Sequence, residues 1–277
     1  MRGYIDLLRP LNCVVAAFAI LIGAAVAVGP GNIGGSALQV AVAGLVGFLF
    51  TGAGNALNDY FDRDVDKVNH PARPIPSGRV SPSNARGIAA TLFIASALLS
   101  VFAGWLASLI VIVNLAAMLL YELRLKKHGW GGNLAISWLV ASLFVFGGAA
   151  AYNGSMAALQ RVSWMGLLAF LATLGREIVK DIEDMAGDAG RRTLPMVLGV
   201  TDAGLVASAS FFVGVALSPL PYTSGILSPA YLGIVALADA FFIYCAWFST
   251  ANPTKVSRAA KYGMVVALLA FLAGGAL

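Results

Sequence analysis

The stretch 36–66, SALQVAVAGLVGFLFTGAGNALNDYFDRDVD, decides the fold of this chain. Its first part, 36–57, carries no charged residue, and it is long enough to cross a bilayer, which takes about 20 apolar residues. Directly after it come the carboxylates of Asp59, Asp62, Asp64 and Asp66. The stretch therefore predicts a membrane helix that delivers a cluster of acids to one surface of the membrane.

The rest of the chain has the composition of an integral membrane protein. Of its 277 residues 59% are hydrophobic and 11% charged, and the mean hydropathy is +0.84, whereas about 25% of the residues of a soluble domain are charged. We expect an all-α membrane protein, one domain over residues 1–277, with nine transmembrane helices. The predicted spans are 11–28, 36–57, 85–103, 106–121, 133–152, 164–179, 203–217, 229–249 and 259–277.

The basic residues predict how these spans are oriented. If the amino terminus is cytoplasmic, every Lys and Arg except Arg161 falls in a cytoplasmic segment, as the positive-inside rule requires. The carboxyl terminus is then outside, and the net charge of +5 does not indicate nucleic-acid binding. Ala25-Val26-Ala27 leaves open a cleaved signal peptide, but a retained first helix is the favoured interpretation. Cys13 and Cys245 lie within predicted spans, so no disulfide is expected.

A second acidic cluster follows the sixth span and reads Lys180-Asp181-Ile182-Glu183-Asp184, with Asp188 close behind. Four spans separate it from the first cluster, so both clusters should emerge on the cytoplasmic face. Counting Glu177, they hold nine of the 13 acidic residues of the chain.

Each cluster places most of its oxygen ligands on one face of a helix that turns 100° per residue. The first face, on a helix expected to run to about Asn69 because Pro71 cannot continue it, holds Asn55, Asn58, Asp59, Asp62 and Asp66. The second face holds Glu177, Asp181, Asp184 and Asp188. Asp64 and Glu183 point away from these faces.

Oxygen ligands without His or Cys favour Mg²⁺ or Ca²⁺ over zinc. Two facing columns of carboxylates would repel each other unless metal and a polyanion lay between them. We therefore expect the clusters to grip a diphosphate through divalent metal. The alternatives are a solvated, charged surface loop and a cation channel or exchanger that uses the acids as ion ligands. Asp239, midway along the eighth span, is either functional or a buried, hydrogen-bonded carboxyl.

Basic and phenolic side chains are expected on the same face, where they would supply further partners for a diphosphate. Arg73 and Arg79 bound a loop rich in Pro and Gly, which favours a rigid, functional loop. For any one of these cations, anchoring to lipid headgroups is the alternative role. The set is Arg73, Arg79, Tyr121, Lys126, Lys180, Arg191 and Arg192.

Taken together, these motifs resemble the UbiA superfamily of intramembrane prenyltransferases over essentially the whole chain. The resemblance is carried by Asn58-Asp59-x-x-Asp62-x-x-x-Asp66, Arg73-Pro-x-Pro-Ser-Gly78, Tyr121 with Lys126, Gly132-Asn133, Asp181-x-x-Asp184-x-x-x-Asp188 and Thr193-Leu194-Pro195. It implies a helical bundle around a central cavity, a cytoplasmic cap over the active site and two Mg²⁺ ions.

Within the superfamily, the segments 8–13 and 176–184 are most similar to the archaeal digeranylgeranylglyceryl phosphate synthases. That resemblance implies transfer of a geranylgeranyl group from geranylgeranyl diphosphate to the free hydroxyl of geranylgeranylglyceryl phosphate, a step in ether-lipid synthesis at the cell membrane. An aromatic quinone precursor or a porphyrin-type ring is the alternative acceptor.

The site residues that follow from the resemblance are hypotheses. The expected Mg²⁺ ligands are Asn58, Asp62, Asp66, Asp181, Asp184 and Asp188. The expected catalytic residues are Arg73, Tyr121, Lys126 and Lys180. The expected substrate-binding residues, including those for the acceptor phosphate, are Arg9, Arg79, Arg191 and Arg192.

Overall fold

A computed structural model describes residues 2–152, 154–185 and 192–276. Across these residues the chain is helical, and a single isolated bridge joins His128 and Arg192. Nine helical segments are long and apolar enough to cross a membrane, as predicted. Their principal helices are α2 (Pro10–Val28), α3 (Ala37–Asp62), α5 (Pro82–Ser100), α6 (Trp105–Leu123), α7 (Trp130–Ala150), α8 (Met156–Asp184), α10 (Val200–Leu217), α12 (Pro229–Trp247) and α13 (Pro253–Ala276).

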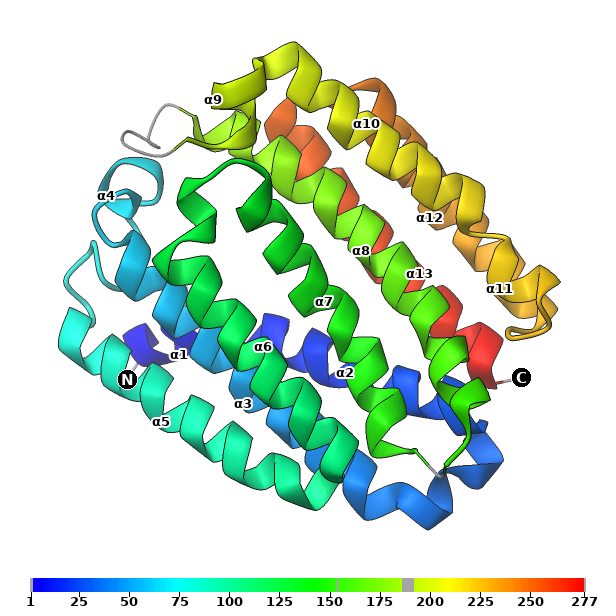
Figure 1. Ribbon diagram of the computed structural model, residues 1–277. Helices are drawn as coiled ribbons and strands as arrows, with labels where there is room; N and C mark the ends of the chain where they lie inside the picture. The colour runs from blue at the N-terminus through cyan, green and yellow to red at the C-terminus, as the bar shows by residue number, and fades with distance from the viewer. Residues whose placement is uncertain (1, 153, 186–191, 277) are drawn as a thin grey trace.

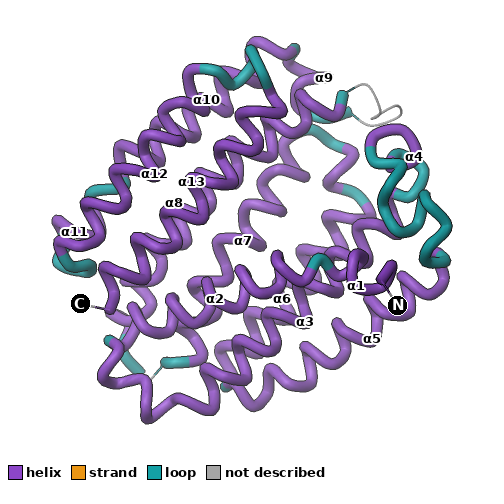
Figure 2. The backbone as a smooth tube through the Cα atoms, turned by 180° about the vertical axis from the view of Figure 1, so that it is seen from behind, coloured by secondary structure: helices purple, strands orange, loops and turns teal. Residues whose placement is uncertain are grey.

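Short elements connect these spans, mostly at their ends. They are α1 (Arg2–Leu8), η1 (Pro30–Ser36), α4 (Asp66–Asn69), η2 (Val101–Ala103), η3 (Leu125–Lys127), α9 (Leu194–Leu198) and α11 (Leu220–Thr223). Figure 1 shows α4 and α9 at the end of the bundle from which α3 and α8 emerge, with the carboxyl terminus at the opposite end. Figure 2 gives the same arrangement from behind. We call the end that carries α4 and α9 the polar end.

The first acidic cluster does not continue as one helix to Asn69, and this part of the sequence prediction was wrong. The span ends at Asp62, turns through 63–65 and resumes as the single turn α4. Arg63 contributes to this end, because its Nη1 donates to the Tyr60 carbonyl at 2.9 Å, a carbonyl that a continuing helix would pair internally. The turn interrupts the regular helix between Asp62 and Asp66.

The loop between α4 and α5 is held in place, as its Pro and Gly content predicts. The backbone N–H of Ser77 donates to the Arg73 carbonyl at 3.0 Å, and that of Val80 donates to Pro74 at 3.0 Å. Ile75 and Val80 are buried in the same apolar cluster as Leu7 of α1. These contacts fix Arg73 beside the acidic cluster.

Two glycines let α2 and α7 approach each other backbone to backbone. A Cβ on Gly147 would lie 2.0 Å from the Ile20 carbonyl oxygen, and one on Gly23 would lie 2.5 Å from the carbonyl oxygen of Phe144. Small residues at such crossings are a common means of packing membrane helices. Since α7 also packs against α8, this crossing helps to position the helix of the second acidic cluster.

Asp239 of α12 has a partner within the bundle. Its Oδ2 accepts a hydrogen bond from the Ser218 hydroxyl at 2.7 Å, and the Tyr231 hydroxyl donates to the Ser218 carbonyl at 2.7 Å. The structure therefore supports the second of the two sequence interpretations, a hydrogen-bonded carboxyl that ties α12 to the end of α10.

The α2–α7 crossing generates a stability prediction. Gly147→Ala should lower the melting temperature of the purified protein, because the new methyl group overlaps the backbone of Ile20 and overpacking costs about 1–3 kcal/mol. Gly87→Ala in α5 is the matched control, since nothing lies within 4 Å of the added Cβ. Equal melting temperatures for the two variants would show that this crossing is not tightly packed.

Candidate active site at the polar end of the bundle

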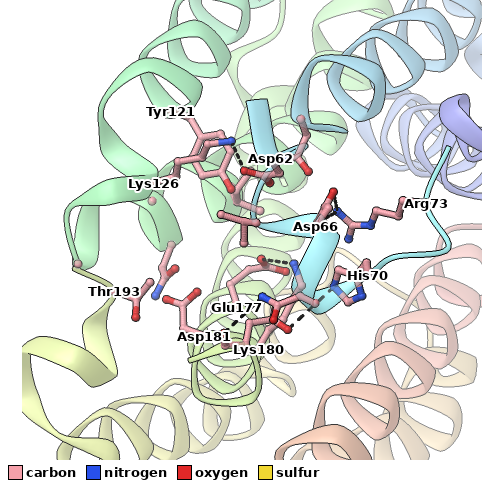
Figure 3. Close-up of a pocket in the computed structure, with 18 residues that line it drawn as sticks. Asp62, Asp66, His70, Arg73, Tyr121, Lys126, Glu177, Lys180, Asp181 and Thr193 are labelled. Atoms are coloured by element: carbon pink, nitrogen blue, oxygen red, sulfur yellow. Dashed lines mark hydrogen bonds and ion pairs between the residues drawn. The ribbon is translucent and has the colours of Figure 1, made fainter. Parts of the chain in front are cut away.

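A pocket opens at the polar end, between the ends of α3 and α8 and the segment that joins α6 to α7 (Figure 3). It brings together side chains from both acidic clusters and from the intervening loops. Its lining consists of Asn58, Asp62, Val65, Asp66, Asn69, His70, Arg73, Tyr121, Lys126, Gly129, Gly132, Asn133, Ile136, Glu177, Lys180, Asp181, Asp184 and Thr193.

The first acidic cluster forms one wall, and each of its pocket carboxylates contacts a cation. Asp62 accepts a hydrogen bond from Lys126 Nζ at 2.7 Å. Both oxygens of Asp66 lie 2.7 Å from Nη1 of Arg73. The two acids are almost fully buried, and burying a charge costs several kcal/mol unless it is paired, so these contacts stabilise ionised carboxylates.

The second cluster forms the facing wall at the end of α8 (Figure 3). Lys180 Nζ lies 3.9 Å from Glu177 Oε2, and His70 Nε2 lies 4.0 Å from Asp184 Oδ1. The Asn69 side chain also donates to the Asp184 backbone carbonyl at 3.4 Å, which ties α4 to the end of α8. The sequence prediction that the two clusters face each other is thus confirmed for the described residues.

Both acids that were predicted to point away from the ligand faces lie outside the pocket, although Asp64 lies in the turn after α3 and not on a helix. Asp64 is exposed and accepts a hydrogen bond from Lys67 at 2.9 Å, and that hydrogen bond lowers the pKa of the Asp64 carboxyl. Glu183 is exposed on the outer side of α8. Neither residue belongs to the pocket.

Asp59 departs from its predicted place on the pocket face. Its carboxylate is fully buried outside the pocket, where it pairs with the Arg9 guanidinium and lies 3.7 Å from Arg73 Nη1. Arg9 adopts a left-handed backbone conformation, with φ of 51°, between α1 and α2. The Arg9–Asp59 pair therefore joins the start of α2 to the end of α3 beneath the pocket.

The predicted catalytic side chains Arg73, Tyr121, Lys126 and Lys180 all line the pocket. Of the predicted substrate-binding residues, the three that the structure describes, Arg9, Arg79 and Arg192, do not line it. Arg79 pairs with Asp6 on the outer surface, and Arg192 is exposed, with its backbone hydrogen-bonded to the loop before α7. Asp188 and Arg191 lie outside the described residues, so their predicted roles stay predictions.

Glu122 is a site residue that the sequence reasoning missed. It is fully buried at the end of α6, where one oxygen accepts from Asn58 Nδ2 at 3.1 Å and the other pairs with Lys126 Nζ. Its signal was present, because Glu122 directly follows the predicted span 106–121 and lies four residues before Lys126, and an acid at the end of an apolar span is a functional candidate. Glu122 orients the Asn58 amide and shares Lys126 with Asp62.

The donor set of the pocket fits a hard divalent cation. Asn58, Asp62 and Asp66 on one wall and Asp181 and Asp184 on the other offer only oxygen ligands to the pocket, which suits Mg²⁺ with water and substrate phosphate. Within the described ranges no three acidic, His or Cys side chains are gathered closely enough to form a cation site on their own. Arg73 and Lys126 pair with acids of the pocket. Phosphate oxygens are alternative partners for these two cations.

Comparisons with known proteins agree on one family. Residues 16–273 match the model of the UbiA prenyltransferase family. The chain is 41% identical to digeranylgeranylglyceryl phosphate synthase of Methanococcoides burtonii, covering 99% of this chain and 100% of that one. It is 39% identical to the synthase of that name from Methanopyrus kandleri, covering 99% of each.

Solved structures share the fold. One, of a digeranylgeranylglyceryl phosphate synthase, has a TM-score of 0.78 at 34% identity and covers 99% of this chain and 98% of its own. A UbiA homologue from Archaeoglobus fulgidus, bound to GPP and Mg²⁺, has a TM-score of 0.68. At 15% identity, with coverage of 99% and 100%, this second likeness concerns the fold alone.

The contacts of Glu122 generate a test. Glu122→Gln should lower kcat by about 10- to 100-fold, because it removes the charge beside Lys126, and hydrogen bonds to charged groups contribute about 1.5–3 kcal/mol. The steady-state rate of diphosphate release checks this, with the melting temperature as a folding control. Glu183→Gln, an exposed acid on α8, is the matched control. Similar rates of diphosphate release for both variants would show that Glu122 does not contribute to catalysis.

Proposed function

The chain belongs to the UbiA prenyltransferase family, and we propose that within this family it transfers a geranylgeranyl group from geranylgeranyl diphosphate to the hydroxyl of geranylgeranylglyceryl phosphate. The observation that carries the proposal is the pocket in which acids of α3–α4 and α8 face each other with Arg73 and Lys126 between them. The nature of the acceptor is supported by the relatives, which are named for that product.

The same donor set supports Mg²⁺ as the cofactor. We assign one ion to Asn58, Asp62 and Asp66 and the other to Asp181 and Asp184, with Asp188 as a predicted further ligand. Bound Mg²⁺ would polarise the diphosphate oxygens and stabilise the charge that the leaving group develops.

The protein's own cations would bind the diphosphate from the other sides. Lys126 Nζ now lies between Asp62 and Glu122, and Arg73 now contacts Asp66. Phosphate oxygens would replace some of these carboxylate contacts, so each cation would exchange one anionic partner for another, and bound Mg²⁺ would pair the carboxylates that are released. The Tyr121 hydroxyl would donate a further hydrogen bond to the leaving group.

In the reaction the allylic C–O bond breaks, and its electron pair goes to the departing diphosphate. The acceptor hydroxyl oxygen then forms the ether bond to that carbon, and its proton passes to a carboxylate of the site or to the released diphosphate. Preorganised charge that favours the diphosphate supplies most of the acceleration. Apolar side chains such as Val65 and Ile136 would exclude water from the allylic cation.

The location of the pocket supports a cytoplasmic active site. The basic connections of the chain gather at the polar end, which the positive-inside rule assigns to the cytoplasm. The amino terminus would lie on that side and the carboxyl terminus outside.

The acids on the pocket faces should be separable from the acids beside them. Asp62→Ala and Asp184→Ala should each reduce prenyl transfer by about 100- to 1,000-fold, the cost typical of losing a preorganised charge contact. Asp64→Ala and Glu183→Ala remove neighbouring acids that lie outside the pocket, so their effect should be much milder. Equal losses for Asp62→Ala and Asp64→Ala would show that the assigned face is wrong.

Metal removal tests the cofactor. EDTA should stop turnover, and added Mg²⁺ should restore it, because ligation by carboxylates is reversible. Diphosphate release in buffer before chelation, after chelation and after adding Mg²⁺ is the measurement. Full activity in EDTA would contradict the metal assignment.

Product analysis tests the proposed reaction itself. Purified protein is incubated with geranylgeranyl diphosphate, Mg²⁺ and either geranylgeranylglyceryl phosphate or 4-hydroxybenzoate. We expect digeranylgeranylglyceryl phosphate from the first mixture and no product from the second. A prenylated aromatic product would keep the family and overturn the acceptor.

A further inference from the structure

Two buried hydrogen-bond donors in the pocket have no partner. Asn133 is 6% exposed and Thr193 is 4% exposed, and neither Asn133 Nδ2 nor Thr193 Oγ1 makes a hydrogen bond. Among the described residues five buried side-chain atoms are unpaired in this way, and only these two belong to residues that line the pocket. A buried polar group without a hydrogen bond is destabilising, so such groups are usually paired.

Local structure does not account for either donor. Thr193 occupies the N-cap position of α9, where Thr side chains usually cap the helix, yet its side chain makes no capping hydrogen bond. Asn133 lies in the first turn of α7, and its backbone carbonyl accepts from the Ser137 hydroxyl at 2.6 Å while its side-chain nitrogen stays unpaired. Neither polar group is therefore satisfied within the described part of the fold.

The backbone holds the two residues on the same side of the pocket. Gly129 N donates to the Arg192 carbonyl at 2.6 Å, and Arg192 N donates to the Lys127 carbonyl at 3.1 Å. These bonds join the segment before α7 to the segment before α9. A Cβ on Gly132 would lie 3.0 Å from the Lys126 Cα, so the first turn of α7 is packed against the backbone of Lys126.

This part of the pocket differs from the part near Arg73. Figure 3 shows Thr193 close to Asp181 and on the same side as Lys126, away from His70 and Arg73. An amide nitrogen can only donate, so Asn133 Nδ2 requires an acceptor atom and cannot bind a metal ion. The first turn of the 21-residue helix α7 adds a positive helix-dipole end, which favours an anion.

We propose that Asn133 and Thr193 form a hydrogen-bonding subsite for phosphate oxygens, separate from the acidic clusters. The inference rests on the proposed function, because the two substrates of that reaction bring phosphate to this pocket. Either the diphosphate of the donor or the phosphate of the acceptor could supply the oxygens. The subsite would orient that group relative to Lys126.

The test removes each donor without changing the size of the side chain much. Thr193→Val and Asn133→Leu delete the donors, and Thr193→Ser keeps the hydroxyl. Thr173→Val is the matched control, since Thr173 is 2% exposed and donates to the Ala169 carbonyl at 2.7 Å outside the pocket. Binding of inorganic diphosphate with Mg²⁺, and separately of glycerol phosphate, is measured by calorimetry on the purified full chain, beside the KM of each substrate.

We expect Thr193→Val and Asn133→Leu to weaken binding of one anion by about tenfold, the factor for one lost hydrogen bond of ordinary strength. Thr193→Ser should restore it and Thr173→Val should leave it unchanged. Weaker diphosphate binding with a raised donor KM would assign the subsite to the donor. Weaker glycerol phosphate binding with a raised acceptor KM would assign it to the acceptor.

Affinities for both anions within twofold of the unmodified chain, in variants that melt normally, would overturn the subsite. If either substitution impairs folding, Thr193→Ala and Asn133→Ala remove the same donors with smaller side chains. Failure of the unmodified chain to bind diphosphate with Mg²⁺ would instead contradict the proposed function, and the subsite would fall with it.

Discussion

Every buried carboxylate described around the pocket must have a positive partner, and this constraint organises the polar end of the bundle. Lys126 stands between Asp62 and Glu122, and Arg73 lies between Asp66 and Asp59. An ion buried without a partner costs several kcal/mol, so acids and bases can be concentrated here only as alternating pairs. When substrate binds, the same constraint can be satisfied in another way, with divalent metal paired to the carboxylates and phosphate paired to Lys126 and Arg73.

The apolar bundle supplies the rigid frame on which these pairs depend. The second acidic cluster is positioned by two sets of contacts. These are the glycine contacts between α2 and α7 and the packing of α7 against α8. The position of Arg73 is fixed by the Arg9–Asp59 pair and by the buried residues Ile75 and Val80 of the loop after α4. A site built on helix ends and a pinned loop is more precise than one carried by a free loop.

Hydropathy and helical periodicity predicted much of this arrangement. Nine spans follow from the lengths of the apolar stretches, and the exposure of Glu183 follows from a rotation of 100° per residue. Asp64 is exposed as expected, but in the turn that ends α3. The same rule misplaced Asp59, because the helix was assumed to present one uniform face, whereas Arg9, at the N-cap of α2, pairs with this carboxylate outside the pocket. Helical periodicity describes one helix at a time, so it gives no information about contacts with residues of other segments.

Other features of the site depend on contacts between distant segments and left no local signal of their geometry. The break after Asp62 is not marked by Pro or Gly, so the sequence favoured a continuous helix. Thr193 was named only as part of a family motif, and its unpaired hydroxyl beside the pocket became visible only in the structure. Glu122 was recognisable as an acid within an apolar span, but its link to Asn58 joins two helices and required the structure.

The most direct test of the central claim is a structure of the protein with a non-hydrolysable thiodiphosphate donor and Mn²⁺ in place of Mg²⁺, with the ions located by anomalous scattering. We expect two Mn²⁺ peaks on either side of one diphosphate, one beside Asp62 and Asp66 and the other beside Asp181 and Asp184. A diphosphate bound without metal, or metal bound away from these two walls, would contradict it.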